Sequence, residues 1–493
     1  MGILEIIETI NDAVGSFVWG LPMLVLLIGT GIMMTVRTGF FQVSHFRHWW
    51  QHTIGAVFTD KHVTAHTDED DRSISQFQSL CTALAATVGT GNIAGVSAAI
   101  AAGGPGAIFW MWIVAFFGMM TNYSENVLGI YYRRKNEHGE WCGGAMYYLR
   151  DGLGSIKGFK KLGSILAVLF AIFCTVASFG IGNMSQINTI AANMNSVFHI
   201  PNAVMGLLLM ILSAVVIIGG LKRIASVTEK LVPFMAIAYM LGALVIIIVN
   251  IGTMPAVLKS IIKGAFAMRA VGGGIVGYGV MQALTWGMKR GVFSNEAGLG
   301  SSVMVHSASN VKEPVKQGMW GIFEVFADTI IICSLTAFVI LSTGMVDLET
   351  GMMISTSAST ALVTEAFSTV FGRFGAMFIA VAVLLFAYST TLGWSEYGTR
   401  AFEYLFGTKR VIIFRVIFVV FIMLGATMEL SLAWALSDTF NGLMAIPNLI
   451  GVAACSPVVV KLTKNYINRR VLGKEEAPMY SAWEDIQKMQ EEE

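Results

Sequence analysis

Residues 79–96 read Ser79-Leu-Cys-Thr-Ala-Leu-Ala-Ala-Thr-Val-Gly-Thr-Gly-Asn-Ile-Ala-Gly-Val96. Glycine destabilises a helix interior by about 1 kcal/mol relative to alanine, so two glycines close together favour a break. A break inside a membrane exposes peptide groups, which must then face protein, water or a ligand. The stretch therefore predicts an interrupted membrane helix with a binding site at its centre. The alternative is close helix packing through Gly91 and Gly95.

The whole chain has the composition of a membrane protein. Of its 493 residues, 55% are hydrophobic and 13% are charged, whereas an average soluble domain carries about 25% charged residues. The formal net charge of +1 gives no bulk electrostatic attraction for nucleic acid. The composition thus excludes a disordered chain, a secreted disulfide scaffold and a nucleic-acid-binding protein. The five cysteines are too widely spaced for a zinc or redox motif, and we expect no cofactor.

Apolar stretches long enough to cross a bilayer recur along the chain. A membrane-spanning helix needs about 20 apolar residues. This criterion predicts an all-α polytopic membrane protein with eleven transmembrane helices, near residues 16–36, 78–101, 106–132, 163–191, 204–220, 231–253, 272–308, 319–343, 374–396, 411–428 and 440–462.

Basic residues are distributed unequally between the connections. One set of loops carries 25 Lys and Arg residues and the opposite set carries four. Because positive residues favour the cytoplasmic side, this asymmetry predicts a multi-pass protein of the cell membrane with its N-terminus outside and its C-terminus in the cytoplasm. We expect the acidic tail, residues 475–493, to be solvated there.

A second interrupted stretch reads Thr285-Trp-Gly-Met-Lys-Arg-Gly-Val-Phe-Ser-Asn-Glu-Ala-Gly-Leu-Gly300. It lies five spans after the first, so the two stretches run in opposite directions. Two inverted halves that each open with a broken helix are typical of secondary transporters, which bind substrate near the bilayer midplane. The predicted division is a peripheral N-terminal span (1–40), a cytoplasmic loop (41–77), two inverted repeats (78–253 and 272–462) and a cytoplasmic tail (463–493).

The predicted breaks suit a zwitterionic substrate. The N-termini of half-helices offer unpaired N–H groups and partial positive charge to a carboxylate. Freed carbonyls and half-helix C-termini can hold a cation or an ammonium group. The ninth span adds a cluster of hydroxyls, Ser389, Thr390 and Thr391, of the kind that sodium accepts. Taken alone, these hydroxyls would more often bond their own helix. Together with the broken second span, they favour an ion site.

The sequence does not decide the role of several charged residues inside the predicted spans. Glu125, Glu324 and Glu396 lie near predicted cytoplasmic ends, where pairing at the interface is the expected role. Asp328 lies deeper, and with Lys289 and Arg290 it would form either a structural ion pair or a gate.

Three motifs resemble those of a known family. Gly103-Gly-Pro-Gly-Ala-Ile-Phe-Trp-Met-Trp112, running on to Gly118, resembles the signature of the alanine or glycine:cation symporter family, the sodium:alanine symporters or amino acid carriers. Residues 89–95 and 291–300 look like two further hallmarks. The resemblance covers about residues 14–465. It implies a leucine-transporter-like fold, in which spans 2–11 form the 5+5 inverted repeat. It also implies sodium- or proton-driven uptake of a small neutral amino acid, namely alanine, glycine or sometimes glutamine, by a protein that is not an enzyme.

The resemblance also implies site residues. Sodium would lie between the carbonyls of Ala85 and Val88 and the hydroxyls of Thr390 and Thr391. The side-chain pocket of the substrate would be lined by Trp394. The remaining substrate contacts would be Thr87, Thr90, Gly91 and Asn92 on one break, and Phe293, Ser294 and Asn295 on the other. Some relatives of the fold carry an acidic or amide residue just before the first break, but here Ala86 stands there. That position therefore gives no support for a second sodium ion.

Four other functions remain as alternatives. A proton-coupled symporter of the same fold tends to carry a lysine in the fifth core helix, but the sixth span, residues 231–250, contains none, which favours sodium. A metal-ion transporter would need an acidic-Pro-Gly-Asn break, which is absent. An intramembrane enzyme would need a nucleophile with a base, or His ligands, inside the spans. Of the eight histidines, only His306 lies close to a span. A channel would not need two inverted broken helices.

Overall fold

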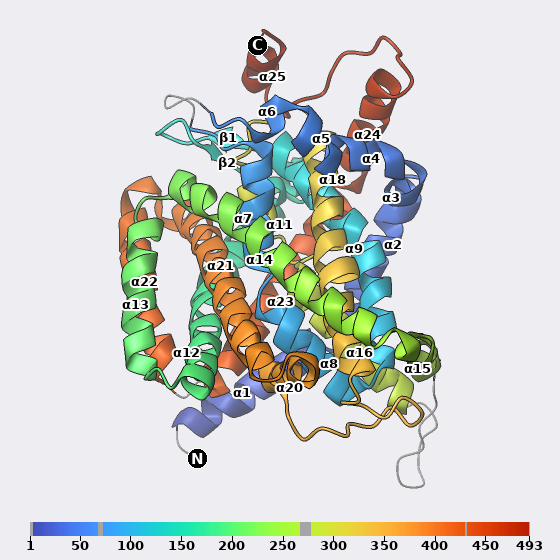
Figure 1. Cartoon of the computed structure of the whole chain (residues 1–493). Coiled ribbons are helices and arrows are strands. Elements are labelled where there is room, and N and C mark those ends of the chain that lie inside the picture. Colours follow the sequence, from blue (N-terminus) through green and yellow to red (C-terminus); the bar gives the residue numbers. More distant parts are fainter. Residues whose placement is uncertain (1–2, 68–71, 267–277, 429–430, 493) are drawn as a thin grey trace.

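The computed structural model describes residues 3–67, 72–266, 278–428 and 431–492, and the described chain is almost entirely helical (Figure 1). The two ends of the chain lie at opposite ends of the molecule. In the described part, seven helices are long and apolar enough to cross a membrane: Ile7–Arg37, Gly106–Tyr131, Lys160–Phe198, Leu221–Val249, Pro314–Ser342, Arg373–Phe406 and Thr408–Thr427.

Several of these spans combine shorter elements. The bounds are α1 (Ile3–Val18), α2 (Leu21–Arg37), α9 (Gly106–Tyr131), α11 (Lys160–Phe179), η4 (Gly180–Met184), α12 (Ser185–Phe198), α14 (Leu221–Val249), α18 (Pro314–Val325), η6 (Phe326–Cys333), α19 (Ser334–Ser342), α21 (Arg373–Phe406), η7 (Thr408–Arg410) and α22 (Val411–Thr427). Both η4 and η6 are π-helical, a wider winding that occurs often at functional sites.

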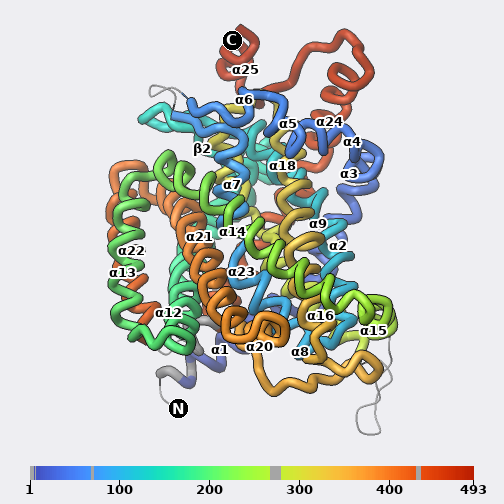
Figure 2. Tube along the Cα trace, in the orientation of Figure 1, coloured from blue at the N-terminus to red at the C-terminus, as the bar shows by residue number. Residues whose placement is uncertain are grey.

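The first predicted break is present as a bend. Helix α7 (Gln76–Thr87) is followed by the π-helical η1 (Gly91–Gly95) and by α8 (Val96–Gly103), with a change of direction of 48°. The tube in Figure 2 shows α7 and α8 at different heights of the molecule. Ser75 begins α7 with a capping box, in which its side chain accepts from Gln78 N–H.

The helix is also interrupted at the second predicted break. Helix α16 (Tyr278–Asn295) ends where Glu296 adopts a φ of 56°, and helix resumes only in the short α17 (Val303–His306). Gly298 and Gly300 have φ values of 92° and 73°, a left-handed conformation that glycine adopts without strain. Residues 272–277 of the predicted seventh span lie outside the described residues.

The prediction of one continuous last span over 440–462 was wrong. Helix α23 (Ser431–Ala454) stops at Cys455, and α24 (Ser456–Arg470) leaves it at an angle of 57°. The physical reason is Pro457, since proline has no N–H to donate and its ring clashes with the preceding turn. If each bent pair counts as one span, the described chain has up to nine. The predicted fifth span corresponds to α13 (Asn202–Ile217), an apolar helix of 16 residues.

The remaining elements are short or lie between the spans. They are α3 (Phe41–Ser44), α4 (Phe46–His52), α5 (Ile54–Thr59), α6 (Lys61–Thr64), β1 (Arg134–Lys135), β2 (Trp141–Cys142), α10 (Ala145–Tyr147), η2 (Tyr148–Gly152), η3 (Leu153–Ser155), η5 (Ile251–Thr253), α15 (Met254–Phe266), α20 (Ser359–Phe371) and α25 (Glu484–Glu492). The strands β1 and β2 form an antiparallel hairpin.

The tail contacts the rest of the protein, although most of its residues remain exposed or half-buried. Ala482 N–H donates to the carbonyl of Tyr131 (2.9 Å), and the guanidinium of Arg134 lies 3.7 Å from the ring centre of Trp483. Lys312 Nζ donates to the carbonyl of Gln490 (3.3 Å). Figure 1 shows α25 at the end of the molecule that carries the β1–β2 hairpin. Hydrogen bonds to main-chain carbonyls and a cation–π contact thus hold the tail against the rest of the protein.

Candidate functional site

The break after α7 redirects two backbone N–H groups. Gly89 N–H donates to the side-chain oxygen of Asn92 (2.8 Å), and Asn92 N–H donates to the carbonyl of Gly89 (3.3 Å). In an unbroken helix, these two N–H groups would bond the carbonyls of Ala85 and Val88. The two carbonyls predicted to hold sodium are therefore the ones that lose their usual helical donors.

Helix α21 packs directly against this break. A Cβ atom built on Gly89 would overlap the hydroxyl oxygen of Thr390, and one built on Gly393 would lie 2.7 Å from the Cβ of Ala86. Glycine at these positions permits the close approach. The predicted hydroxyl ligand Thr390 is thereby brought against Gly89, the residue that follows the predicted carbonyl ligand Val88.

Both predicted threonine ligands also bond their own helix. Thr390 donates to the carbonyl of Phe386 and Thr391 donates to that of Ala387, each at 3.0 Å. A hydroxyl that donates its hydrogen to the helix keeps lone pairs that can face a cation. These hydroxyls can therefore bond their own helix and bind a cation at the same time.

The two breaks touch each other. A Cβ atom built on Gly91 would lie 3.2 Å from the Cα of Ser294 and 3.4 Å from the ring of Phe293. Beside them, Asn295 accepts from Ala297 N–H (3.0 Å) and donates to the hydroxyl of Thr329 (3.0 Å). The predicted substrate residues of the two helices therefore form one continuous group.

Two threonines at the first break differ in their hydrogen bonding. The hydroxyl of Thr87 contacts the carbonyls of Ala83 (3.3 Å) and Leu84 (3.5 Å). The hydroxyl of Thr90 is buried and has no partner among the described residues. A buried polar atom without a partner is costly, so Thr90 is the hydroxyl better suited to a ligand.

Trp394 lies on the other side of the group, one turn beyond Thr390 on α21. It is 1% exposed, and its Cβ packs against Gly182 in η4. Its side chain lies near Glu296, the first residue after α16. The predicted pocket residue thus lies beside the second break.

Asp328 was not among the predicted site residues, although the sequence marked it as a deep charge. Its carboxylate is fully buried and accepts from Asn92 Nδ2 (2.6 Å), Ser294 Oγ (3.1 Å) and Thr329 Oγ1 (2.8 Å). Neither Lys289 nor Arg290 pairs with it. Asp328 therefore connects one residue of each break, which only the packing of three helices could reveal.

Lys289 pairs instead with Asp438 on α23, at 2.5 Å. Both side chains are 20% exposed, at the wall of a cavity of about 610 Å³ between α1, α16 and α23. Arg290 is directed elsewhere: its guanidinium lies 5.3 Å from the ring centres of both Trp286 and Phe293. Lys289, at the cavity wall, lies about two helical turns before the second break at Glu296.

The three carboxylates expected to pair at the interface are all fully buried. Glu324 lies 3.0 Å from the ring nitrogen Nε2 of His306. Glu125 accepts from the side-chain amide of Asn448. Glu396 accepts from Arg400 Nε (2.7 Å), so its pairing is as expected, but within the protein rather than at its surface.

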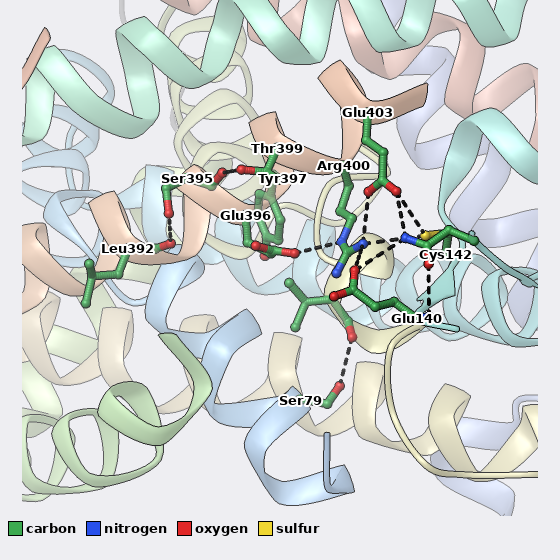
Figure 3. A network of polar contacts seen from close by, with 12 residues as sticks. Ser79, Glu140, Cys142, Leu392, Ser395, Glu396, Tyr397, Thr399, Arg400 and Glu403 are labelled. Atoms are coloured by element: carbon green, nitrogen blue, oxygen red, sulfur yellow. Dashed lines mark hydrogen bonds and ion pairs between the residues drawn. The ribbon is translucent and has the colours of Figure 1, made fainter. Parts of the chain in front are cut away.

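Arg400 also joins α21 to the β1–β2 hairpin, as Figure 3 shows. Its guanidinium contacts Glu403 (2.9 Å) on the same helix and Glu140 (3.1 Å) on the hairpin. Burial acts to raise the pKa of the Glu140 carboxyl, but the charge and hydrogen bond of Arg400, the hydrogen bond from Asn136 and the charge of Arg415 together outweigh it, and the pKa is lowered. The ion pair is therefore intact at neutral pH. Among the described residues, no group of three or more His, Cys, Asp or Glu side chains is arranged to hold a metal ion.

Both the sequence and the fold of the chain are similar to those of known proteins. The sequence profile of the sodium:alanine symporter family matches residues 4–480. The sodium/alanine symporter AgcS of Methanococcus maripaludis is 44% identical over 467 residues, which cover 94% of this chain and 98% of AgcS. The probable sodium/glutamine symporter GlnT of Bacillus subtilis is 35% identical over 474 residues, which cover 96% of this chain and 93% of GlnT. The crystal structure of MhsT in complex with L-phenylalanine matches with a TM-score of 0.51 at 13% identity, over 80% of this chain and 99% of MhsT, a likeness in fold alone.

Proposed function

Because the chain belongs to the sodium:alanine symporter family, we propose that it imports a small neutral amino acid together with sodium by alternating access. Alanine or glycine is the first candidate, since the relative AgcS is named a sodium/alanine symporter. Glutamine is the second, since the relative GlnT is named a probable sodium/glutamine symporter. The family consists of transporters, not enzymes.

The observation that carries the proposal is the contact between Thr390 and the first break. Sodium would bind the carbonyls of Ala85 and Val88, which have lost the N–H groups of Gly89 and Asn92, and the hydroxyls of Thr390 and Thr391. Carbonyl and hydroxyl oxygens of a broken helix are the ligands that such transporters use for sodium.

The amino acid would bind where the two breaks meet. Its carboxylate suits the N-terminal end of η1, at Gly91 and Asn92, where the helix carries partial positive charge. The unpartnered hydroxyl of Thr90 supplies a further hydrogen bond. Trp394 would bound the side-chain pocket. The contacts from the second break would come from Phe293, Ser294 and Asn295, and Thr87 would complete the first.

We further propose the membrane arrangement that the loop charges predict. The N-terminus faces outside, so the cavity beside the Lys289–Asp438 pair is an external entrance. Residues 78–253 and 272–462 form the two inverted repeats of five helices, and residues 1–40 form the peripheral span. The loop 41–77 and the tail 463–493 lie in the cytoplasm.

In the proposed cycle, sodium binds first from outside and links α7 to α21. It thereby orders the unwound backbone on which the amino acid then binds, so the two ligands bind cooperatively. Such coupling is typically worth about 1–3 kcal/mol. Inward opening releases both into a cytoplasm that is low in sodium. The membrane potential adds about 2.3 kcal/mol per charge per 100 mV.

The alternative is a proton-coupled symporter of the same fold. Helix α14, the sixth predicted span, has Lys222 and Lys230 near its cytoplasmic end but no lysine between Leu231 and Val249. A lysine in that segment would supply the positive charge that replaces sodium, so its absence favours sodium.

The test is uptake by the purified protein in proteoliposomes. Labelled alanine, glycine and glutamine are supplied under an imposed sodium gradient or an imposed proton gradient. Sodium-driven accumulation of one of the three is expected. Accumulation with the proton gradient alone would show that the proton, and not sodium, is the coupling ion. No accumulation with either gradient would reject the substrate class.

A further inference from the structure

A charged cavity that the proposed transport cycle does not use lies where the β1–β2 hairpin, α21 and the beginning of α22 meet. Its volume is about 230 Å³, and its lining includes Glu140, Arg400, Glu403, Lys409 and Arg415. The hairpin lies at the end of the molecule that carries α25 (Figure 1), and the proposed membrane arrangement places that tail in the cytoplasm. We therefore expect the cavity to be accessible to cytoplasmic solutes.

The two arginines of the cavity differ in their pairing. Figure 3 shows that Arg400 is surrounded by carboxylates, which belong to Glu396 (2.7 Å), Glu403 (2.9 Å) and Glu140 (3.1 Å). Arg415 has neither an ion pair nor a hydrogen bond with any residue that the structure describes, and its Nε atom is buried. A buried polar group without a partner is costly, and more so when it is charged. The cavity therefore contains a guanidinium that lacks a counter-charge.

A carboxylate oxygen is also available at this cavity. Both side-chain hydrogen bonds of Glu140 in the described chain are accepted by its Oε2, from Asn136 (3.4 Å) and Arg400 (3.1 Å). The side chain is 33% exposed. Although burial acts to raise the pKa of this carboxyl, the charges of Arg400 and then of Arg415 help to lower it. Glu140 and Arg415 are thus close enough for their charges to interact, but they form no ion pair.

We propose that this cavity is a second binding site for a small α-amino acid, which enters from the cytoplasm. The carboxylate of the amino acid would bind the guanidinium of Arg415, whose two parallel donors match a carboxylate. Its ammonium group would bind Glu140 Oε1. This inference rests on the proposed function and membrane arrangement.

The charges of the cavity favour a zwitterion over a plain anion. Glu140 and Glu403 line the same small space as Arg415 and would repel a phosphate or a carboxylate that carries no ammonium group. A zwitterion instead satisfies the free guanidinium and the free carboxylate oxygen together. An amino acid is therefore a better match than the phosphate of a lipid headgroup.

A bound amino acid would connect parts of the protein that move separately when the hairpin undocks. It would link Arg415 on α22 to the hairpin, which Arg400 already joins to α21. Helix α21 also carries Thr390 of the proposed sodium site. A ligand that binds only the docked hairpin stabilises the docked arrangement. Accumulation of the amino acid in the cytoplasm would thus hold the hairpin on α21.

The test is equilibrium binding of labelled alanine to the purified full-length protein without sodium. The central site stays empty under this condition, because the proposed cycle fills it only after sodium binds. We expect one alanine per wild-type protein, and binding about tenfold weaker or more in Arg415→Gln, since charge-assisted hydrogen bonds are the strong ones. Arg410→Gln, which removes an exposed charge just before α22, is the control and should bind like the wild type.

Two analogues of alanine test the site in the wild type alone, in case Arg415→Gln does not fold. Propionate keeps only the carboxylate and ethylamine keeps only the ammonium group, so neither should displace labelled alanine. Displacement by propionate would mean that the cavity binds plain anions.

Other outcomes also overturn the inference. They are the absence of sodium-free alanine binding in the wild type, and equal binding in the wild type and Arg415→Gln. A phospholipid that copurifies with the wild type but not with Arg415→Gln, while alanine binding is unchanged, would assign Arg415 to a lipid phosphate.

Hydrogen–deuterium exchange tests the link to the hairpin. Alanine without sodium should slow amide exchange of residues 134–142 in the wild type but not in Arg415→Gln. Unchanged exchange in the wild type saturated with alanine would contradict the link. Failure of the proposed function has a different signature, because sodium-free alanine binding would then remain while sodium-driven uptake in proteoliposomes is absent.

Discussion

Asn92 shows what a single residue does at the centre of this protein. It is fully buried and bonds both to its own broken helix, through Gly89 N–H, and to the carboxylate of Asp328 on another helix. A leucine there would leave Gly89 N–H without this acceptor and would remove one of the three side-chain donors to Asp328. Buried polar networks of this kind specify one arrangement only when every member is satisfied.

At the same scale, Thr390→Ala tests the proposed sodium site. Removal of the hydroxyl that lies against Gly89 should raise the sodium concentration for half-maximal alanine uptake by about tenfold, because one lost ligand is worth roughly 1.4 kcal/mol. The measurement is uptake against sodium concentration in proteoliposomes.

Thr427→Ala is the matched control for Thr390→Ala. Thr427 also donates to a carbonyl one turn earlier, that of Met423 (2.9 Å), but it lies at the exposed end of α22. The sodium dependence of alanine uptake by Thr427→Ala should equal that of the wild type. Equal sodium dependence in well-expressed Thr390→Ala protein would show that the hydroxyl serves only its helix.

At the scale of elements, the break between α7 and η1 depends on contact with α16. Gly91→Leu places a branched side chain where a Cβ alone would lie 3.2 Å from Ser294. We expect loss of amino-acid binding, by at least tenfold in affinity, with normal membrane insertion. Equilibrium binding of labelled alanine to purified protein measures it.

Gly29→Leu is the control for this substitution. Gly29 lies in the apolar helix α2, and a Cβ atom built on it has no other atom within 4 Å. The Gly29→Leu variant should therefore bind alanine normally. Wild-type affinity in Gly91→Leu would mean that Gly91 serves helix packing and not the substrate.

The β1–β2 hairpin and α21 form a second pair of coupled elements. The pKa of Glu140 is lowered below the ordinary 4.5, so its bond to Arg400 stabilises the docked hairpin above that pH and is lost as the pH falls through the lowered value. Glu140→Gln should therefore speed amide exchange of residues 134–142 at pH 7 several-fold.

Hydrogen–deuterium exchange followed by mass spectrometry measures this change. Glu137→Gln, an exposed carboxylate on the same hairpin, should leave the exchange rate unchanged. Equal protection in Glu140→Gln and the wild type would show that the hairpin is held by its other contacts.

At the scale of the whole molecule, the tail connects parts that are distant in sequence. It reaches Tyr131 and Arg134 near the hairpin and Lys312 beside α18, while the family profile ends at residue 480. Helix α25 therefore lies beyond the part of the chain that the family shares.

Trp483→Ala should release this tail. The indole contributes the contact with Arg134, and cation–π pairs contribute about 0.5–2 kcal/mol. Limited proteolysis should cleave the variant after residue 474 several-fold faster than the wild type. Lys488→Ala, an exposed change on α25, is the control. Identical cleavage of all three proteins would mean that the other tail contacts suffice.

The sequence by itself determined that the chain crosses a membrane and where its first helix breaks. These are local properties: a bilayer requires long apolar helices, and glycines such as Gly89 and Gly91 weaken a helix wherever they occur. The position of Thr390 was also predictable, because the family resemblance carried it. The tertiary structure alone decided the partners of the charges. Asp328 meets Asn92 and Ser294, Lys289 meets Asp438, and Trp483 docks on Arg134, because these pairs lie on different elements and pairing depends on how the elements pack, which no local pattern records.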